Sequence, residues 1–194
     1  MDRMVATSQE MGTMHEWIEN AIGTAAAKPS VKVECLTQGW GSLQKEKAIG
    51  GGPLCLNGRT FATGLGTHAP SEIVVRASAP IKRFSALAGV DDNAITRRVA
   101  SEMVFTVEVG GKVAWSSGPL RVSSSPAQVD LDLKDAMEFT LKVNDSLNYA
   151  HANWANAVVT LEDGTAIDIG TQDRGFRPAL PFSFRYGGRE SWQL

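Results

Sequence analysis

The feature that most constrains this chain is a regular alternation of apolar and polar residues, which begins at Val31. Val31, Val33 and Cys35 alternate with Lys32 and Glu34. Such alternation is typical of a half-buried β-strand, because successive side chains of a strand point to opposite faces of the sheet. Similar stretches follow, and we expect further strands at residues 73–76, 83–90, 101–109, 112–115, 127–133, 137–143, 157–162 and 165–169. The sequence therefore predicts a protein dominated by short strands.

Short glycine-containing turns separate several of the expected strands. Gly110-Gly111 and Asp163-Gly164 are suited to the positive φ angles that tight hairpins require. Hairpins join antiparallel neighbours, and no helical crossover separates these strands. The predicted fold class is therefore all-β, and a jelly-roll β-sandwich is favoured over a parallel sheet.

The two ends of the chain differ from its β-rich middle. Residues 8–27 carry apolar side chains at three- and four-residue steps, which predicts a helix that ends before Pro29. We therefore expect an N-terminal helical segment over residues 1–30 and a β-sandwich over residues 31–171. Residues 172–194 are expected to form a linker and the beginning of another module.

Composition excludes some classes of partner. Hydrophobic residues make up 43% of the 194 residues, enough for one core, and the net charge is −2. Without a basic cluster, neither nucleic acid nor an anionic membrane surface is a predicted partner. The sequence has no apolar run of about 18 residues that could span a bilayer. The first residues do not resemble a secretory signal, and the compartment stays open.

The chain contains two cysteines, Cys35 and Cys55. They are expected either to form one disulfide or to serve as two small, buried hydrophobic side chains. Neither lies in a CxxC or CxxH pattern, so a zinc site is not predicted.

Carboxylates are present, but their placement does not favour catalysis. A glycosidase needs two carboxyl groups on either side of the bond that it cleaves. Adjacent Asp91 and Asp92 in a loop point apart, whereas Asp130 and Asp132 share the solvent face of one expected strand. The sequence also lacks a Gly-x-Ser-x-Gly nucleophile motif. It therefore favours a binding module over an enzyme.

Residues suited to sugar binding cluster in the segment His151-Ala152-Asn153-Trp154, which is expected to form one turn of a loop. A pyranose has an apolar face and a rim of hydroxyls, so its site needs an aromatic wall and a few planar polar groups. Trp154 is a candidate wall, with His151 and Asn153 as hydrogen-bonding partners. Trp40 is a candidate second wall, and His68 and Asp91 are candidate polar contacts.

Each candidate also has a purely structural interpretation. Trp154 precedes an apolar strand and is equally suited to the core. For Trp40, too, a sugar-binding wall and a core side chain are both open alternatives. His68 is suited to holding a loop through its ring nitrogens. Asp92 is suited to capping the turn that follows it. The exposure of the two tryptophans distinguishes a sugar site from a packed core.

Four ordered blocks of the sequence resemble the NPCBM family of carbohydrate-binding modules, which is found beside glycoside hydrolases such as family 98. The similarity extends from Gln38 to Glu162, and the blocks are residues 64–73, 83–84, 89–92 and 151–155. The resemblance implies a fold similar to galactose-binding domains. The family motif positions map to His68, Asp91, Asp92, His151 and Trp154.

The last block departs from the family pattern. The family commonly has Asp-His-Ala-Asp-Trp, whereas this chain has Ala150 and Asn153 at the two acidic positions. An asparagine keeps an acceptor and gains donors, so hydroxyl recognition by Asn153 is still expected. The resemblance also implies a structural calcium ion, with Asp91 and Asp92 as oxygen donors. Loss of the two carboxylates weakens that expectation.

Residues 181–191 resemble the beginning of bacterial α-galactosidase-type glycoside hydrolases. Together the resemblances imply a fragment of a glycoside hydrolase whose β-sandwich is not catalytic. This module is expected to bind terminal galactose-type sugars and to target an attached α-galactosidase-like hydrolase to glycans. The alternative is a spacer domain that packs on the catalytic module and binds no sugar.

Overall fold

The computed structural model describes residues 29–99, 101–144, 149–171, 185–186 and 189–190. The chain divides into two compact units, Pro29–Gln172 and a second unit formed by Met1–Lys28 with Asp173–Leu194. In the second unit, β12 (Arg185–Tyr186) pairs antiparallel with β13 (Arg189–Glu190). The helix predicted over residues 8–27 and most of the predicted hydrolase-like tail lie outside the described residues.

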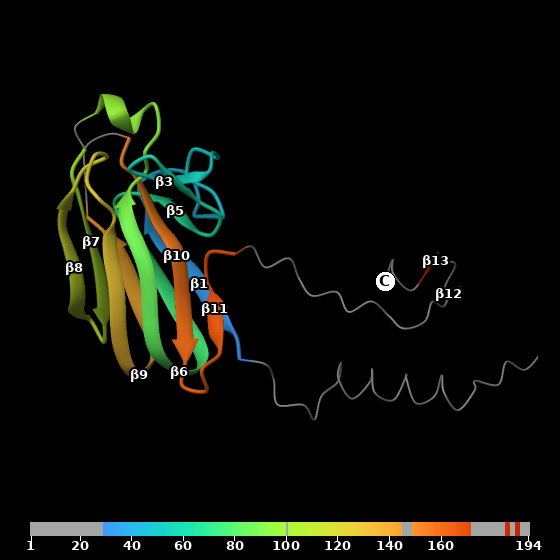
Figure 1. Ribbon diagram of the computed structural model, residues 1–194. Coiled ribbons are helices and arrows are strands. Elements are labelled where there is room, and N and C mark those ends of the chain that lie inside the picture. The colour runs from blue at the N-terminus through green and yellow to red at the C-terminus, as the bar shows by residue number, and fades with distance from the viewer. Residues whose placement is uncertain (1–28, 100, 145–148, 172–184, 187–188, 191–194) are drawn as a thin grey trace, which may run out of the picture. The chain divides into compact units, whose positions relative to one another are not determined.

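The first unit is built from antiparallel strands, which confirms the predicted all-β class (Figure 1). Its strands are β1 (Val31–Gln38), β2 (Gln44–Lys45), β3 (Leu54–Leu56), β4 (Arg59–Phe61), β5 (Gly64–His68), β6 (Ser71–Val90), β7 (Met103–Val109), β8 (Lys112–Leu120), β9 (Ala127–Val143), β10 (His151–Leu161) and β11 (Ala166–Asp168). A 3-10 turn, η2 (Thr96–Arg98), follows β6. Among the described residues, no helix is long and apolar enough to cross a membrane.

Two long strands connect the layers of the sandwich. The first half of β6 pairs with β1 and the end of β9, whereas its second half pairs with β10 and the beginning of β9. The register shifts between Arg76 and Ile81 on β6, and Lys134 and Asp135 on β9 have positive φ angles. Bulges of this kind bend a strand without ending it. The sequence predicted two separate strands in each of these regions, and that division was wrong.

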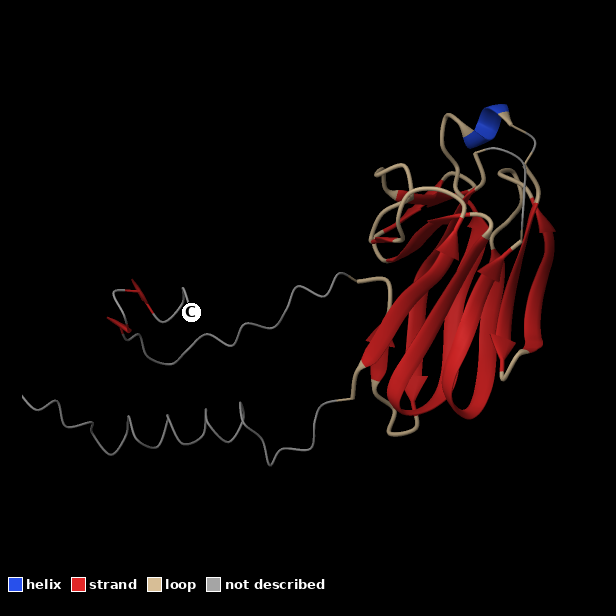
Figure 2. Cartoon of the chain, turned by 180° about the vertical axis from the view of Figure 1, so that it is seen from behind, coloured by secondary structure: helices blue, strands red, loops and turns tan. Residues whose placement is uncertain are grey.

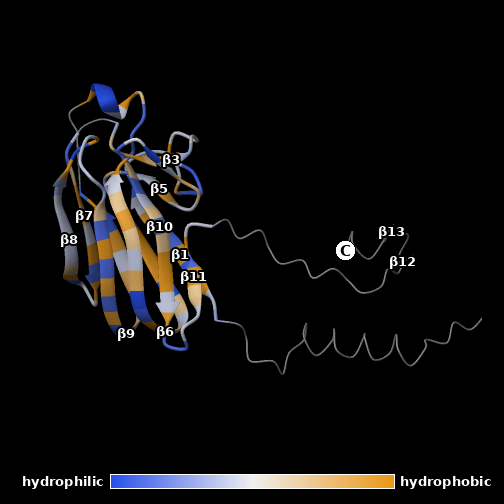
Figure 3. Cartoon of the chain, viewed as in Figure 1, coloured by the Kyte–Doolittle hydropathy of each residue, from blue (hydrophilic) through white to orange (hydrophobic). Residues whose placement is uncertain are grey.

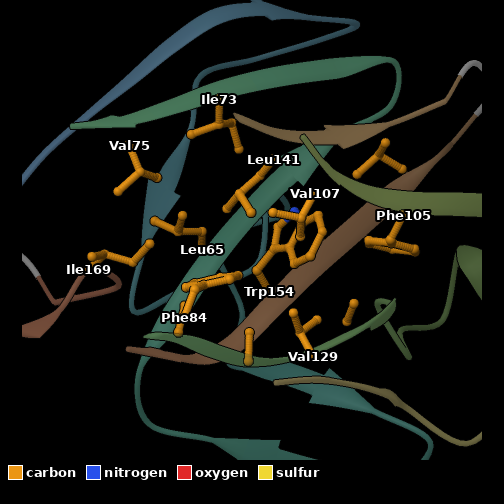
Figure 4. Close-up of a cluster of buried hydrophobic side chains, with 14 of the residues drawn as sticks. Leu65, Ile73, Val75, Phe84, Phe105, Val107, Val129, Leu141, Trp154 and Ile169 are labelled. Carbon is orange, nitrogen blue, oxygen red and sulfur yellow. The ribbon is translucent and has the colours of Figure 1, made fainter. Parts of the chain in front are cut away.

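Figure 2 shows how the strands are arranged, and Figure 3 shows apolar residues recurring along them. The core is formed by buried apolar side chains of β5, β6, β7, β9 and β10. Phe84 and Phe139 pack with ring centroids 4.6 Å apart. The rings of Phe105 and Trp154 pack edge to face, with their centroids 5.3 Å apart. Figure 4 shows Phe84, Phe105 and Trp154 among Leu65, Ile73, Val107 and Leu141. A fully buried side chain of this size contributes about 1.5–3 kcal/mol through the hydrophobic effect.

The strand β10 is buried on both of its faces near its beginning. Ala152 and Trp154 belong to the core cluster, whereas Asn153 points to the other face and contacts the backbone of Cys55 on β3. The loop before β3 packs directly on β5, because a Cβ on Gly66 would come within 2.3 Å of the Lys47 carbonyl oxygen. This covering layer gives the outer face of β5 and β10 a second interior, in which Leu54 and Leu56 are buried together with the polar side chains of Asp91 and Asn153.

Cys35 and Cys55 carry free thiols, so the interpretation as two separate side chains is confirmed and no disulfide joins them. Burial raises the pKa of both thiols.

Candidate functional site

A cavity of about 610 Å³ lies where β5 ends and β10 begins. It is lined by Gly39, Trp40, Gly50, His68, Ile95, Tyr149 and His151. We call it the Trp40 pocket. Three apolar or aromatic side chains at the pocket are open to solvent, with exposed fractions of 61% for Trp40, 53% for Tyr149 and 44% for Ile95. His151, in contrast, is buried. The pocket therefore combines an exposed aromatic rim with an imidazole at its buried side.

The backbone around Trp40 is fixed although its ring is exposed. The Gln38 side chain, at the end of β1, donates from Nε2 to the Trp40 carbonyl at 2.6 Å and accepts from the Thr67 hydroxyl at 2.8 Å. The Gly39 amide donates to the His68 carbonyl at 3.1 Å. A Cβ at Gly39 would lie 2.5 Å from the Ala69 carbonyl oxygen, so only glycine permits this approach. These contacts with β1 and β5 fix the backbone that carries the exposed Trp40 ring.

Two histidines of neighbouring strands lie side by side in the pocket. His68 on β5 is paired in register with His151 on β10, and their ring centroids are 5.6 Å apart. The ring of His68 also packs edge to face with the Trp40 ring, and the two centroids are 6.2 Å apart. Burial, followed by the nearby His68, lowers the pKa of His151, while Asp91 opposes this shift. Because its pKa is lowered, the ring of His151 stays neutral to a lower pH than an ordinary histidine.

A chain of polar side chains connects His151 to the buried Asp91. Asn93 Nδ2 lies 3.0 Å from His151 Nδ1 and donates to Asp91 Oδ2 at 2.6 Å. Asp91 Oδ1 accepts hydrogen bonds from Asn153 Nδ2 at 2.6 Å and from the Cys55 amide at 3.2 Å. The carboxylate therefore organises the residues behind the pocket.

Trp154 is not part of an exposed site, and its prediction as a sugar-stacking wall was wrong. The ring has no exposed surface and packs in the core against Phe105. The prediction placed His151-Ala152-Asn153-Trp154 on one turn, but these residues open β10. Alternation along the strand then sends Trp154 inward and His151 to the opposite face.

Asn153 and Asp91 were also wrongly predicted as direct sugar contacts. Both side chains are buried, and their described partners are protein groups. Of the six predicted sugar-binding residues, the structure brings Trp40, His68 and His151 together in one pocket. Asn153 and Asp91 lie behind them.

The predicted calcium donors, Asp91 and Asp92, do not fit a calcium ion. Every carboxylate oxygen of the pair accepts a hydrogen bond from an N–H group, including the Gly58 amide and Arg97 Nε on Asp92. A guanidinium therefore stands where a cation would have to bind, and it lowers the pKa of Asp92. Among the described residues, no three His, Cys, Asp or Glu side chains form a group able to hold a metal ion.

The pocket is suited to a neutral ligand with hydroxyl groups. No Asp, Glu, Lys or Arg is among the described residues that line it. Aromatic surface and imidazole nitrogens instead offer stacking and neutral hydrogen bonds. Sequence reasoning missed Tyr149 and Ile95 at the rim and Asn93 behind it. Tyr149 directly precedes the Ala150-His151 motif and Asn93 directly follows Asp91-Asp92, so proximity to the motif was an available signal.

Comparison with known proteins gives concordant results. Residues 28–160 match the NPCBM/NEW2 domain. A protein of Renibacterium salmoninarum named as an endo-alpha-N-acetylgalactosaminidase is 31% identical over 130 residues, which are 62% of this chain and 8% of that protein. The alpha-1,3-galactosidase B of Akkermansia muciniphila is 28% identical over 141 residues, which are 69% of this chain and 17% of that protein. The match thus spans less than a fifth of either relative.

A solved structure shares the fold. It contains the CBM51-2 and INT domains of Clostridium perfringens ZmpB in complex with GlcNAc. It is 30% identical to this chain with a TM-score of 0.60, and the alignment covers 67% of this chain and 29% of that one.

Proposed function

Because this chain belongs to the NPCBM/NEW2 family of carbohydrate-binding modules, we propose that the Trp40 pocket binds a terminal galactose-type pyranose. The exposed indole of Trp40, which lies in one pocket with His68 and His151, is the observation that carries the proposal. The apolar face of the sugar stacks on the indole. Its hydroxyls bond to the imidazole nitrogens.

The choice of a galactose-type sugar is supported by the relatives. The names of both curated relatives refer to galactose or N-acetylgalactosamine. The ZmpB module, in contrast, was solved with GlcNAc, so a gluco-configured sugar is the competitor to test. The neutral lining of the pocket agrees with an uncharged sugar of either configuration.

The role of the module is to hold an attached glycoside hydrolase at its glycan. The chain matches only a small part of two much longer proteins with glycosidase names. One pyranose on an open ledge gains limited contact area, so affinity is expected at about 0.1–1 mM, which corresponds to roughly −4 to −5.5 kcal/mol. Weak binding of this kind keeps the enzyme close to its glycan and still allows it to dissociate from one sugar and bind another.

The test is an NMR titration of the 194-residue chain with methyl β-galactoside, N-acetylgalactosamine and N-acetylglucosamine. We expect saturable shifts at Trp40, His68 and Tyr149, with the galactose-type sugars binding more tightly than N-acetylglucosamine. Trp40→Ala should abolish the shifts.

The matched control is Val113→Ala, which removes another exposed apolar side chain from β8 outside the pocket. This variant should bind like the wild type. Absence of binding by the wild type, or equal binding by Trp40→Ala and Val113→Ala, would contradict the proposal and favour a spacer domain.

A further inference from the structure

The side-chain amide of Asn93 is fixed by its partners on both sides. Its Oδ1 accepts hydrogen bonds from the backbone amides of Ile95 at 2.8 Å and Thr96 at 3.0 Å. Its Nδ2 donates to Asp91 Oδ2 at 2.6 Å. A rotated amide would set its NH₂ group against two N–H donors and its oxygen against a carboxylate. The oxygen and nitrogen of Asn93 can therefore be assigned without ambiguity.

This assignment determines the tautomer of His151. The second hydrogen of Asn93 Nδ2 points to His151 Nδ1, 3.0 Å away, so Nδ1 must be the acceptor. In a neutral imidazole one ring nitrogen accepts and the other carries the proton, which places the proton of His151 on Nε2. The Cε1 edge of the ring faces Gly50, since a Cβ built there would lie 3.9 Å from Cε1. Gly50 and His151 both line the pocket. Because Nε2 is bonded to Cε1 and carries the proton, we expect it to be the donor that this ring offers to a ligand.

His68 has the opposite arrangement. Its Nδ1 lies 2.7 Å from the Ala69 carbonyl oxygen, which can only accept, so Nδ1 carries the proton. The Nε2 of a neutral His68 is then an acceptor. The two rings, 5.6 Å apart, therefore supply one acceptor and one donor to the same pocket.

We propose that Asn93 is a positioning residue of the Trp40 pocket. It holds His151 as a hydrogen-bond donor beside the acceptor of His68, and the pair recognises two neighbouring hydroxyls of one pyranose, of which one accepts and the other donates. This inference rests on the proposed function for the identity of the ligand. The tautomers themselves are properties of the free protein.

The first measurement needs neither sugar nor mutation. Long-range proton–nitrogen NMR correlations of the imidazole rings, recorded well above the ordinary histidine pKa of about 6.5, show which ring nitrogen carries the proton. We expect the proton on Nε2 in His151 and on Nδ1 in His68. A proton on Nδ1 of His151 overturns the proposal, whether or not any sugar binds.

The second measurement uses a variant that reverses the direction of the hydrogen bond between residue 93 and His151. In the double variant Asp91→Asn with Asn93→Asp, the amide at position 91 still accepts from Asn153 and Cys55 and donates to the carboxylate at position 93. That carboxylate then accepts from His151 Nδ1, and the net charge is unchanged. We expect the proton of neutral His151 to move to Nδ1 and the affinity for methyl β-galactoside to fall about tenfold or more.

Arg98→Gln is the matched control, because it changes an exposed side chain in the same loop without touching the partners of Asn93. It should keep both the tautomer and the affinity. If the double variant does not fold, Asn93→Ala replaces it and should remove the preference for the Nε2 proton. An unchanged tautomer in a folded variant, or a changed tautomer with unchanged affinity, overturns the proposal. Expected tautomers in a wild type that binds no sugar overturn the proposed function instead.

Discussion

Two regions of this molecule are each organised around a tryptophan, and they use it in opposite ways. Trp154 is the fourth residue of β10, faces the core and has no exposed surface. Trp40 lies in the loop between β1 and β2, and 61% of its surface is exposed. Both occur beside small residues, so residue type and neighbours do not separate them. What separates them is the direction imposed by the backbone, since a strand residue of given parity must point inward whereas a loop residue need not.

The largest effect should follow from Trp154→Ala. Removing a large buried ring leaves a cavity, so the free energy of unfolding should fall by about 3–5 kcal/mol. Urea denaturation measures this loss. A variant that stays within about 0.5 kcal/mol of the wild type would mean that the ring is not in the core, and the contrast between the two tryptophans would disappear.

A substitution in the polar layer behind the pocket should have the next largest effect. Asn153→Asp replaces a donor that lies 2.6 Å from Asp91 with a second carboxylate. The buried repulsion and the lost hydrogen bond should lower the free energy of unfolding by about 2–3 kcal/mol. Asn156→Asp adds the same charge at an exposed position of β10 and should have little effect. Equal effects of the two variants would show that the polar layer is not tightly organised.

Stability should also depend on pH through His151, with a smaller effect. Burial lowers the pKa of His151 in the folded protein, so above the unfolded-state pKa of about 6.5 the ring is neutral in both states. As the pH falls below that value, the unfolded state binds more protons and the folded state loses relative stability, down to the folded-state pKa. Urea denaturation between about pH 5 and 8 should show this decline. His151→Asn should remove this component, and the same slope in that variant would assign it to another group.

Trp40→Ala should change stability least. The exposed ring contributes little to the core, and the contact of Gln38 with the Trp40 carbonyl involves only the backbone, so the free energy of unfolding should stay within about 0.5 kcal/mol. The same variant is expected to lose sugar binding. A large loss of stability, measured by urea denaturation, would mean that Trp40 is a structural residue and that the two regions are alike.

The sequence anticipated part of the site and misplaced the rest. Trp40, His68 and His151 were among its candidates, and the structure brings all three into one pocket. Trp154 was misplaced because His151-Ala152-Asn153-Trp154 was interpreted as a loop, which ignored that a strand would separate Trp154 from its polar neighbours. Asn93 was missed because its importance depends on a partner that is remote in sequence, His151, at a separation of 58 residues.

By itself, the sequence determined the all-β class and the family, because alternation and local motifs are properties of short segments. The tertiary structure alone decided which tryptophan is exposed, which carboxylate is buried and how β6 and β9 connect the layers. Those outcomes depend on contacts between segments far apart in the chain. For example, Gly50, in the loop before β3, lies against His151, and Cys55 on β3 accepts a hydrogen bond from Asn153, although both partners are on β10. Burial and hydrogen-bond direction arise from that assembly, and they bring one exposed indole and two imidazoles into a candidate sugar site.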